Sequence, residues 1–260
     1  MRKIEFNETQ LKDIIERYKN GEAIMNIRKD YNVSHNAINR VLKENNVAIR
    51  GNRKHFYNDN VFKKIDTAEK AYWIGFITAD GYINEDKNFM RIKLQEKDKA
   101  HLYKFMNFIG GDEGMIKYEF HNITGNKQWY IEVNGKSFIK SLVDLGIRQR
   151  KSSNEQWCDK IPEEYIKDYI RGIIDGDGHI SLDRKNFNIC NSYSLLKNLQ
   201  RYLIKKYNTT ETNIYEHCHT KRLYVTVNAV AILIDLYYEN CVSLDRKYKT
   251  VKILKQLIEL

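Results

Sequence analysis

The sequence lacks the features that would place it in a membrane or in an oxidising compartment. No apolar run approaches the roughly 20 residues that a transmembrane helix needs. Residues 1–6 do not form the apolar segment of a secretory signal peptide. The four cysteines, Cys158, Cys190, Cys218 and Cys241, are scattered without C-x-x-C spacing, which indicates reduced thiols and no disulfide framework. We therefore expect a protein of the cytoplasm or of an organellar matrix.

The charge of the chain is strongly basic. It has 44 Lys and Arg residues against 34 Asp and Glu residues, a formal net charge of +10 in 260 residues. The hydrophobic share of 42% is typical of a globular protein with one large core or two modest ones. An excess of positive charge favours a polyanionic partner such as nucleic acid. The alternative is a basic protein with no such partner.

Residues 1–50 carry the pattern of three short helices. Asn20-Gly21-Glu22 interrupts the first helical stretch, and Ser34 is suited to cap the third. A helix, a turn and a Ser-capped helix of this length resemble a helix-turn-helix. The third helix would then expose four side chains that contact bases or phosphates: His35, Asn36, Asn39 and Arg40. An ordinary three-helix packing unit is the alternative.

A basic stretch joins this module to the rest of the chain. We expect residues 51–68 to form a linker. Arg50, Arg53 and Lys54 either lie along a phosphate backbone or are simply solvated.

The rest of the chain contains an internal repeat. The apolar helical segments 71–81 and 168–178 both carry a small residue every fourth position and end in Asp-Gly, 97 residues apart. Two halves, 69–155 and 156–260, each show the order helix, two strands, helix, two strands, helix. The sequence therefore predicts an α+β fold of two duplicated αββαββα units after a small all-α module. Two further landmarks support the duplication: residues 131–134 match 225–228 after 94 residues, and residues 149–151 match 245–247 after 96.

The small residues of the repeated segment predict a close pair of helices. Gly75 and Ala79 share one helix face, as do Gly172 and Gly176. Glycine inside a helix costs roughly 1 kcal/mol relative to alanine, so a helix that keeps it gains close backbone approach to a neighbour. We expect the two helices to pack side by side about a pseudo-twofold axis within a monomer.

Asp80 and Asp177 each end one of these helices, before a glycine suited to a left-handed cap. The helix dipole disfavours a negative charge there by ~0.3–1 kcal/mol, and helix packing would bring the two carboxylates close together. A divalent cation would offset both repulsions, and hard oxygen ligands favour Mg²⁺ over zinc. The expected ligands are the two carboxylates with the backbone carbonyls of Ala79 and Gly176. The alternative is that each aspartate is only a turn residue.

The two segments resemble the paired motifs of the LAGLIDADG homing endonucleases. The resemblance rests on residues 73–81 and 170–178 and extends over about residues 70 to 255. It puts the metal-binding acids at Asp80 and Asp177. It implies Mg²⁺-dependent cleavage of both DNA strands across the minor groove, with short 3′ overhangs. It also implies saddle-shaped antiparallel sheets whose concave faces lie in the major groove.

Two motif positions depart from the family pattern. Thr78 stands in the first copy where the second has Asp175, and Arg171 stands where small or apolar residues are common. Neither departure removes the metal acids. Both bear on the details of the helix interface.

The resemblance also implies polar side chains around the scissile phosphates. Lys93 and Asn188 fit the strand before the middle helix, and Lys151 and Lys247 fit the lysine after the closing helix. Such a lysine would stabilise the pentavalent phosphorane or lower the pKa of a bound water. The alternative for each lysine is a solvated surface charge.

Strand alternation predicts which side chains would contact DNA. Ile92 and Leu94 point to one side of their strand, and the residues between them point to the other. The predicted DNA contacts are Arg91, Lys93, Gln95, Tyr130, Glu132, Arg222, Tyr224 and Thr226. These positions differ between the halves, so the target should be asymmetric double-stranded DNA.

His217-Cys218-His219 is the one tract that suggests zinc. Alternation puts both histidines on one strand face, but the sequence has no partner pair with zinc-ligand spacing. We therefore expect a phosphate or base contact there.

Our leading interpretation is an intron- or mobile-element-type homing endonuclease. The alternative is a non-cleaving transcription regulator or an RNA maturase on the same scaffold, and a maturase would add an intron RNA as partner. Relatives of that kind tend to lose the acids, which this chain keeps. An intein is disfavoured because no N-terminal Cys or Ser and no C-terminal His-Asn pair frames the chain.

Overall fold

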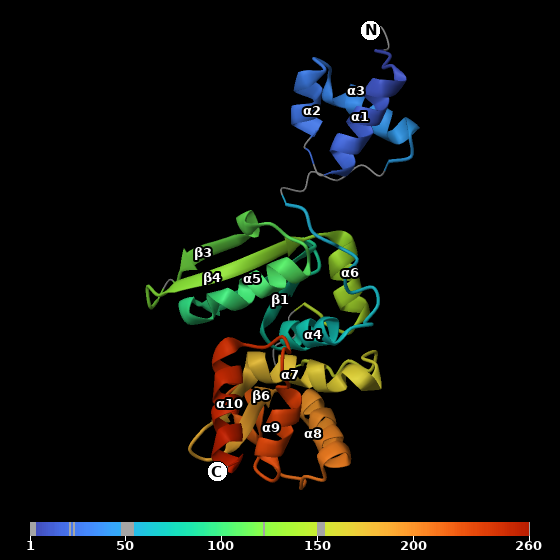
Figure 1. The fold of residues 1–260 in the computed structure, drawn as a ribbon. Coiled ribbons are helices and arrows are strands. Elements are labelled where there is room, and N and C mark those ends of the chain that lie inside the picture. The colour runs from blue at the N-terminus through green and yellow to red at the C-terminus, as the bar shows by residue number, and fades with distance from the viewer. Residues whose placement is uncertain are drawn as a thin grey trace. The chain divides into compact units, whose positions relative to one another are not determined.

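The structure, a computed structural model, describes residues 4–20, 22, 24–47, 55–121, 123–149 and 154–259. The chain divides into two units, Met1–Phe56 and Tyr57–Leu260, and each is described by itself (Figure 1). Across the described residues, no helix combines the length and the apolar character that crossing a bilayer would require.

The N-terminal unit holds the three predicted helices: α1 (Glu8–Lys19), α2 (Ile24–Asp30) and α3 (His35–Glu44). Asn7 caps α1 with a capping box, and the Ser34 hydroxyl caps α3 by accepting from the Ala37 amide at 3.2 Å. A small core of its own closes the unit, built mainly from Ile14, Ile27 and Ile38.

The first half of the second unit follows the predicted order. Its elements are α4 (Ala68–Asp80), β1 (Gly81–Asn84), β2 (Phe89–Gln95), η1 (Glu96–Asp98), α5 (Lys99–Phe108), η2 (Glu113–Met115), β3 (Ile116–Phe120), β4 (Lys127–Asn134) and α6 (Lys136–Asp144). The four strands form an antiparallel sheet in the order β1-β2-β4-β3.

The second half repeats this order and adds one helix. Its elements are η3 (Glu163–Tyr165), α7 (Ile166–Asp177), β5 (Gly178–Ser181), β6 (Asn186–Asn191), α8 (Tyr193–Tyr207), β7 (Ile214–His217), β8 (Thr220–Val225), α9 (Ala229–Leu236) and α10 (Asp245–Glu259). Its sheet has the matching order β5-β6-β8-β7, again antiparallel. The predicted α+β architecture of two αββαββα halves is confirmed.

Strand register fixes which residues of the two halves are equivalent. Gly81 pairs with Ile92 and Gly178 pairs with Ile189, so the 97-residue spacing holds through the first two strands. Ile92 then pairs with Ile131, whereas Ile189 pairs with Leu223, so β4 and β8 correspond after 92 residues. The expected spacing of 94 residues for this landmark is wrong by two. A slip of two preserves the strand face, so the predicted inward and outward positions are unaffected.

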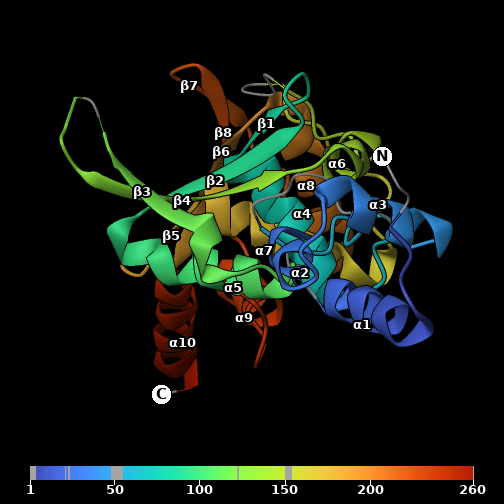
Figure 2. The ribbon, with the colours of Figure 1, turned by 90° about the horizontal axis from the view of Figure 1, so that it is seen from above.

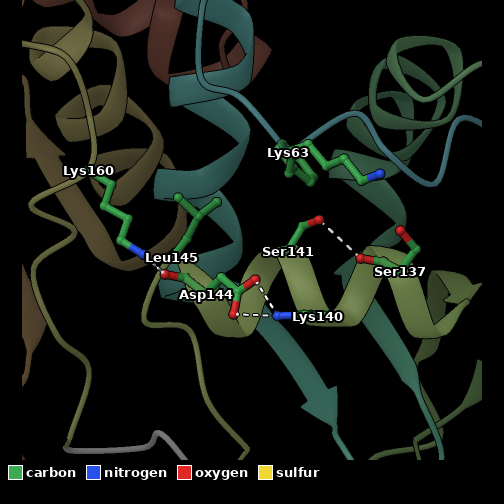
Figure 3. Close-up of a pocket in the computed structure, with 8 residues that line it drawn as sticks. Lys63, Ser137, Lys140, Ser141, Asp144, Leu145 and Lys160 are labelled. Atoms are coloured by element: carbon green, nitrogen blue, oxygen red, sulfur yellow. Dashed lines mark hydrogen bonds and ion pairs between the residues drawn. The ribbon is translucent and has the colours of Figure 1, made fainter.

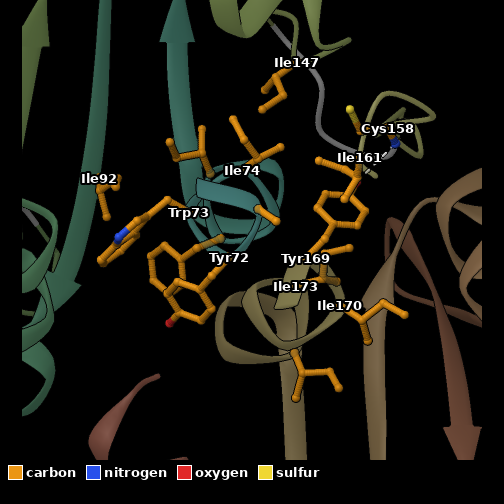
Figure 4. Close-up of a cluster of buried hydrophobic side chains, with 14 of the residues drawn as sticks. Tyr72, Trp73, Ile74, Ile92, Ile147, Cys158, Ile161, Tyr169, Ile170 and Ile173 are labelled. Atoms are coloured by element: carbon orange, nitrogen blue, oxygen red, sulfur yellow. Dashed lines mark hydrogen bonds between the residues drawn. The ribbon is translucent and has the colours of Figure 1, made fainter. Parts of the chain in front are cut away.

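Helices α4 and α7 lie side by side at the centre of this unit in both views (Figure 1 and Figure 2), and Figure 1 shows one half on each side of the pair. One continuous core spans both halves. Figure 4 shows its centre, where Tyr72 and Trp73 of α4 lie near Tyr169 and Ile173 of α7. Because the two cores are fused across the helix pair, each half depends on the other for burial.

The stretch expected to be a linker is partly core. Val61, Phe62 and Ile65 are buried in the main cluster, where the Phe62 ring packs against Phe108 and Phe138. The basic residues that suggested a linker end at His55, and the apolar spacing after it reflects packing.

The β7–β8 connection also differs from the expectation. The strand predicted to run through His219 stops at His217, which pairs with Thr220. Cys218 and His219 form a two-residue hairpin turn, with Cys218 in the left-handed region at φ +52°. The two histidines therefore do not alternate along one strand face.

Candidate functional site

The site begins with the contact between α4 and α7. A methyl group on Gly75 would lie 2.0 Å from the carbonyl oxygen of Tyr169, and one on Gly172 would lie 2.1 Å from that of Tyr72. These distances are far inside van der Waals contact, so the two helix backbones touch. Near the C-terminal ends, a methyl group on Gly176 would lie 2.3 Å from the Cβ atom of Ala79. The structure thus brings together the four small residues of the repeated segments.

The two aspartates end the paired helices. Asp80 is the last residue of α4 and is exposed, and Asp177 is the last residue of α7 and is half-buried. A Cβ atom placed on Gly176 would lie 3.4 Å from the Asp80 amide nitrogen, so the two acids begin at adjoining helix ends. Both carboxylates raise the pKa of the same ammonium group, that of Lys247.

The glycines after the acids have a different role from the one expected. Gly81 (φ −77°) and Gly178 (φ −92°) are extended, not left-handed. A Cβ atom on Gly81 would lie 2.6 Å from the carbonyl oxygen of Ile77, and one on Gly178 would lie 2.5 Å from that of Ile174. Glycine is required because the chain turns directly from helix into strand against its own last turn.

We expected Lys247 to lie beside the scissile phosphates, but its side chain is directed into the protein. Its side chain is 3% exposed, and its Nζ donates to the carbonyl oxygens of Ile174, Asp175 and Gly178 at 2.5, 2.8 and 2.6 Å. An ammonium group has three N–H donors, and all three are used. Burial lowers the pKa of Lys247 to about 8, against the raising effect of the nearby carboxylates, Asp175 first among them. The geometry makes Lys247 a cap for the C-terminus of α7, where a cation offsets the helix dipole.

Sequence reasoning missed Asn191. Its side chain is 2% exposed, and its Nδ2 donates to Asp177 Oδ2 at 2.6 Å. The 97-residue spacing puts Leu94 at the equivalent place in the first half, where a hydrocarbon cannot donate. The signal was present in the sequence as a polar residue 97 positions after an apolar one. It was hidden by a slip of two positions, because Lys93 was matched with Asn188, 95 residues away.

The same slip affects Lys93 and Asn188. Both lie on the outward faces of their strands, as predicted, but they are not each other's counterparts. The register makes Cys190 the equivalent of Lys93, and Arg91 the equivalent of Asn188. Lys151 lies outside the described residues.

Asp175 has a structural role in the helix interface. It is fully buried and accepts hydrogen bonds from Tyr72 Oη at 2.8 Å, Tyr237 Oη at 2.7 Å and the Leu244 amide at 2.7 Å. Burial raises the pKa of Asp175, opposed by Lys247 and by these donors. Thr78, at the same motif position in α4, instead donates to the Ile74 carbonyl at 2.8 Å. Asp175 therefore joins α7 to Tyr72 of the other half.

Buried His101 extends this network. Tyr72 gives its only proton to Asp175, so the contact of 2.8 Å between Tyr72 Oη and His101 Nε2 requires the ring to donate. His101 Nδ1 is buried and has no partner among the described residues. Burial lowers the pKa of His101 to about 3, with Lys104 and Lys247 adding to the effect.

Arg171, the other departure, fastens α7 to the segment after α9. It is 1% exposed, pairs with Asp168 at 2.7 Å, and donates to the carbonyls of Leu236 and Val242 at 2.7 and 2.8 Å. These partners explain how the helix tolerates a buried cation in place of a small residue.

Hard oxygen donors gather where the helices end. The carboxylates of Asp80 and Asp177 and the backbone carbonyls of Ala79 and Gly176 are hard oxygen donors of the kind that bind a divalent cation. The described residues contain no group of three or more His, Cys, Asp and Glu residues that would form a closed protein cage. His217, Cys218 and His219 are among the described residues and belong to no such group, so they form no zinc cluster there.

A cavity of about 210 Å³ beside α6 does not include the acid pair (Figure 3). Lys140 pairs with Asp144 at 2.8 Å, and Lys160 donates to the Asp144 carbonyl at 2.5 Å. The ammonium groups of Lys140 and Lys160 are therefore bound by Asp144, which also lines the cavity.

Comparison with known proteins agrees with this geometry. Residues 67–145 match the family model described as a LAGLIDADG-like domain. Residues 67–145 therefore resemble a LAGLIDADG-like domain. The structure of the homing endonuclease I-WcaI bound to its DNA recognition sequence superimposes with a TM-score of 0.53 and 15% identity, over 80% of this chain and 97% of that one. At this identity, the match shows a shared fold.

Two curated proteins of Methanocaldococcus jannaschii are similar in sequence. The glutamine–fructose-6-phosphate aminotransferase (isomerizing) is 25% identical over 158 residues, which is 58% of this chain and 14% of that protein. An uncharacterized protein is 28% identical over 120 residues, which is 45% of this chain and 41% of that protein. The chain thus spans less than half the length of either relative.

The outer face of the first LAGLIDADG sheet carries paired charges. Arg91 donates to Glu132 through Nη2 at 2.7 Å and lies 3.8 Å from Glu119, and Lys93 is ion-paired with Glu119. The Tyr130 ring lies under the Arg91 guanidinium, 4.5 Å from its centroid. Gln95, also on this face, is exposed. Each predicted cation on this face has a carboxylate neighbour.

The outer face of the second LAGLIDADG sheet is different. Arg222 and Tyr224 lie on β8, and Thr226 follows its end. They line a cavity of about 480 Å³ together with Thr212, Tyr215, Glu216 and His217. A cavity of about 540 Å³ at the first sheet is lined by different residues, among them Gln95 of β2 and Gln128 of β4.

Of the four side chains of α3 that were predicted to contact DNA, some are exposed and others are held by contacts within the N-terminal unit. His35 and Asn36 are exposed at the start of α3, and Asn39 donates to His35 Nδ1 at 2.9 Å. Arg40 instead donates to the Ile4 carbonyl, with Glu44 at 3.8 Å, so it fastens the N-terminal segment to α3 and is not directed outward as expected. Arg50, Arg53 and Lys54 lie outside the described residues.

Proposed function

We propose that this chain is a site-specific homing endonuclease that makes a Mg²⁺-dependent double-strand break in a long asymmetric DNA target. The observation that carries the proposal is the pair of carboxylates, Asp80 and Asp177, at the adjoining ends of two helices whose backbones touch. One acid comes from each half, as cleavage of two antiparallel strands about a twofold axis requires. The DNA-bound homing endonuclease of the same fold supports the proposal.

The residues of the site divide into those that hold the cation and those that position them. Asp80 and Asp177, with the carbonyls of Ala79 and Gly176, would hold Mg²⁺. Bound there, the cation would lower the pKa of a water and neutralise charge at the phosphate. The touching helices fix the separation of the acids, since neither backbone can move closer. Lys247 fixes the last turn of α7.

We assign DNA binding to the outer faces of the two sheets. The first face offers Arg91, Lys93, Gln95, Tyr130 and Glu132, and the second offers Asn188, Arg222, Tyr224 and Thr226. The two sets share almost no chemistry at equivalent positions, so the two half-targets differ in sequence. In the N-terminal unit, the proposed additional contacts are His35 and Asn36 at the start of α3, with Arg50, Arg53 and Lys54 as basic residues near the phosphates. In the second unit, Lys151 is proposed as a further basic residue near the phosphates.

The test is cleavage of a duplex DNA library with randomised sequence. The full chain is incubated with the library and Mg²⁺, and the cut ends are sequenced. We expect one enriched asymmetric target with staggered ends on both strands. Asp80→Asn and Asp177→Asn should each lower double-strand cleavage by about 100-fold or more while binding in Ca²⁺ persists.

The chain offers a matched pair of controls. Asp86 and Asp183 are exposed and lie 97 residues apart in the equivalent β1–β2 and β5–β6 turns. Asp86→Asn and Asp183→Asn remove the same charge away from the helix ends, and we expect unchanged cleavage. Specific binding without any cleavage would favour the regulator alternative. Binding confined to RNA would favour a maturase.

A further inference from the structure

Arg222 is held in one orientation by three acceptors. Its Nε donates to Cys190 Sγ at 3.1 Å, and its Nη1 donates to Tyr224 Oη at 3.2 Å. Its Nη2 contacts His217 Nε2, and because a guanidinium can only donate, that ring nitrogen is the accepting one. The three partners come from β6, β8 and β7, so three of the four strands of the sheet hold the side chain.

These three contacts leave a defined pair of donors. A guanidinium carries five N–H groups, one on Nε and two on each terminal nitrogen. The acceptors use one N–H of each nitrogen, so Nη1 and Nη2 of Arg222 each keep one. One remaining N–H on each terminal nitrogen lets the guanidinium donate to two acceptors of one planar ligand.

The charge of Arg222 is not neutralised by its partners. Cys190, Tyr224 and His217 all accept through uncharged atoms. Glu216 is the acidic residue in the lining of the adjacent hollow, and it is ion-paired with Lys221. The hollow of about 480 Å³ therefore presents an oriented cation beside the Tyr224 ring, 5.9 Å from its centroid.

Arg91 of the first sheet, in contrast to Arg222, is paired with carboxylates. Its Nε and Nη2 both donate to Glu132 Oε2, at 3.2 and 2.7 Å, and its Nη1 lies 3.8 Å from Glu119. Two carboxylates thus compete with any outside ligand for its donors. Among the described residues, no carboxylate is ion-paired with Arg222.

We propose that Arg222 is a preorganised guanine reader, which sets one fixed guanine in the half-target that faces the second sheet. In the major groove, O6 and N7 of guanine are the adjacent acceptor pair that an arginine fork contacts. Preorganisation removes the conformational entropy that a free arginine side chain loses on binding. This inference rests on the proposed DNA binding by the outer faces of the sheets.

The experiment compares base preference in the full chain and in Arg222→Lys. Binding is measured in Ca²⁺ on the selected target and on variants with each base at every position. For the wild type, we expect one position in one half-target where guanine exceeds every other base by about 5- to 100-fold. Arg222→Lys keeps the charge and loses the fork, so that preference should collapse to about twofold or less while the preferences of the other half-target remain.

A modified base tests the atoms themselves. Replacing the guanine by 7-deazaguanine removes the N7 acceptor and keeps base pairing. We expect wild-type affinity to fall by about tenfold, with little further effect in Arg222→Lys. Arg201→Lys is the matched control, because Arg201 is an exposed arginine of α8, and we expect an unchanged base preference.

The outcomes separate the two proposals. Duplex binding with a guanine preference that Arg222→Lys retains, or that 7-deazaguanine leaves intact, overturns the guanine reader alone. A chain that binds no duplex DNA overturns the proposed function together with this inference.

Discussion

The two halves of the LAGLIDADG unit place their aspartates in different surroundings on the same scaffold. Asp177 is half-buried, accepts from buried Asn191, and ends a helix whose last carbonyls are capped by Lys247. Asp80 is exposed and has Leu94 at the position of Asn191. Duplication preserved the backbone and the acids, whereas the supporting side chains diverged. Equivalent positions in the chain are therefore not equivalent sites.

The halves remain alike where their helices touch, and this gives the largest expected effect. Gly75→Ala and Gly172→Ala should each destabilise the unit by about 3 kcal/mol, because the added methyl group meets a carbonyl oxygen at 2.0–2.1 Å. Thermal and urea unfolding measure the change. Two losses of similar size support a symmetric interface, and a neutral result for either substitution contradicts it.

In the second half Lys247 caps the end of α7, and its replacement should have the next largest effect. Lys247→Met keeps most of the buried volume and leaves three carbonyl groups without their donor. We expect a loss of about 2–3 kcal/mol in unfolding free energy, with cleavage reduced further than stability alone explains. The control is Lys249→Met, an exposed residue of the same helix. Equal behaviour of the two variants would contradict the capping role.

His101 gives the first half a pH dependence of its own. Its folded-state pKa of about 3 lies below the ordinary 6.5, so between these values the unfolded chain binds a proton that the folded chain does not. Stability should fall as pH drops below about 6.5, by up to about 1.4 kcal/mol per pH unit from this group. Urea unfolding at pH 7 and pH 5 measures the slope. In His101→Phe the slope should be shallower, and an unchanged slope would remove His101 as its source.

The smallest expected effect comes from replacing Asn191, which donates a hydrogen bond to Asp177. Asn191→Leu gives the second half the residue of the first, and Leu94→Asn does the reverse. Under the proposed function, Asn191→Leu should slow cleavage of one strand by roughly 10-fold, about the worth of a hydrogen bond to a charged group, with little change of the other strand. Nicking of separately labelled strands gives the ratio, and DNA affinity in Ca²⁺ serves as a readout that does not depend on cleavage. Equal slowing of both strands would mean that Asn191 does not act through Asp177 alone.

The distribution of charge refines the argument from net charge. Seven of the ten excess positive charges lie in the short segments 1–3, 48–54 and 150–153, so the folded halves and the three-helix unit are close to neutral. Net charge alone therefore overstates how basic the sheet faces are. On the outer face of the first sheet, for example, Arg91 and Lys93 are paired with glutamates, so their charges are largely neutralised.

Much of the fold was readable from the sequence because its signals are local. Helix periodicity, strand alternation, the Ser34 cap and the repeated Asp-Gly each depend on a few neighbouring residues. The partners of charged side chains were not readable, because they join residues far apart in the chain. Lys247 meets the end of α7, 69 to 73 residues away, and Arg40 meets Ile4, 36 residues away.

The sequence by itself determined the duplication, the two acids and the small residues that pair the helices, since spacing and residue size are properties of the chain. Only the tertiary structure decided the strand register, the caps of the helix ends and the partners that hold or neutralise each arginine and lysine. A hydrogen bond selects its partner by distance and direction, and those are fixed only after both halves have packed across α4 and α7. The same residue types therefore give a paired cation on one sheet and an oriented, unneutralised one on the other.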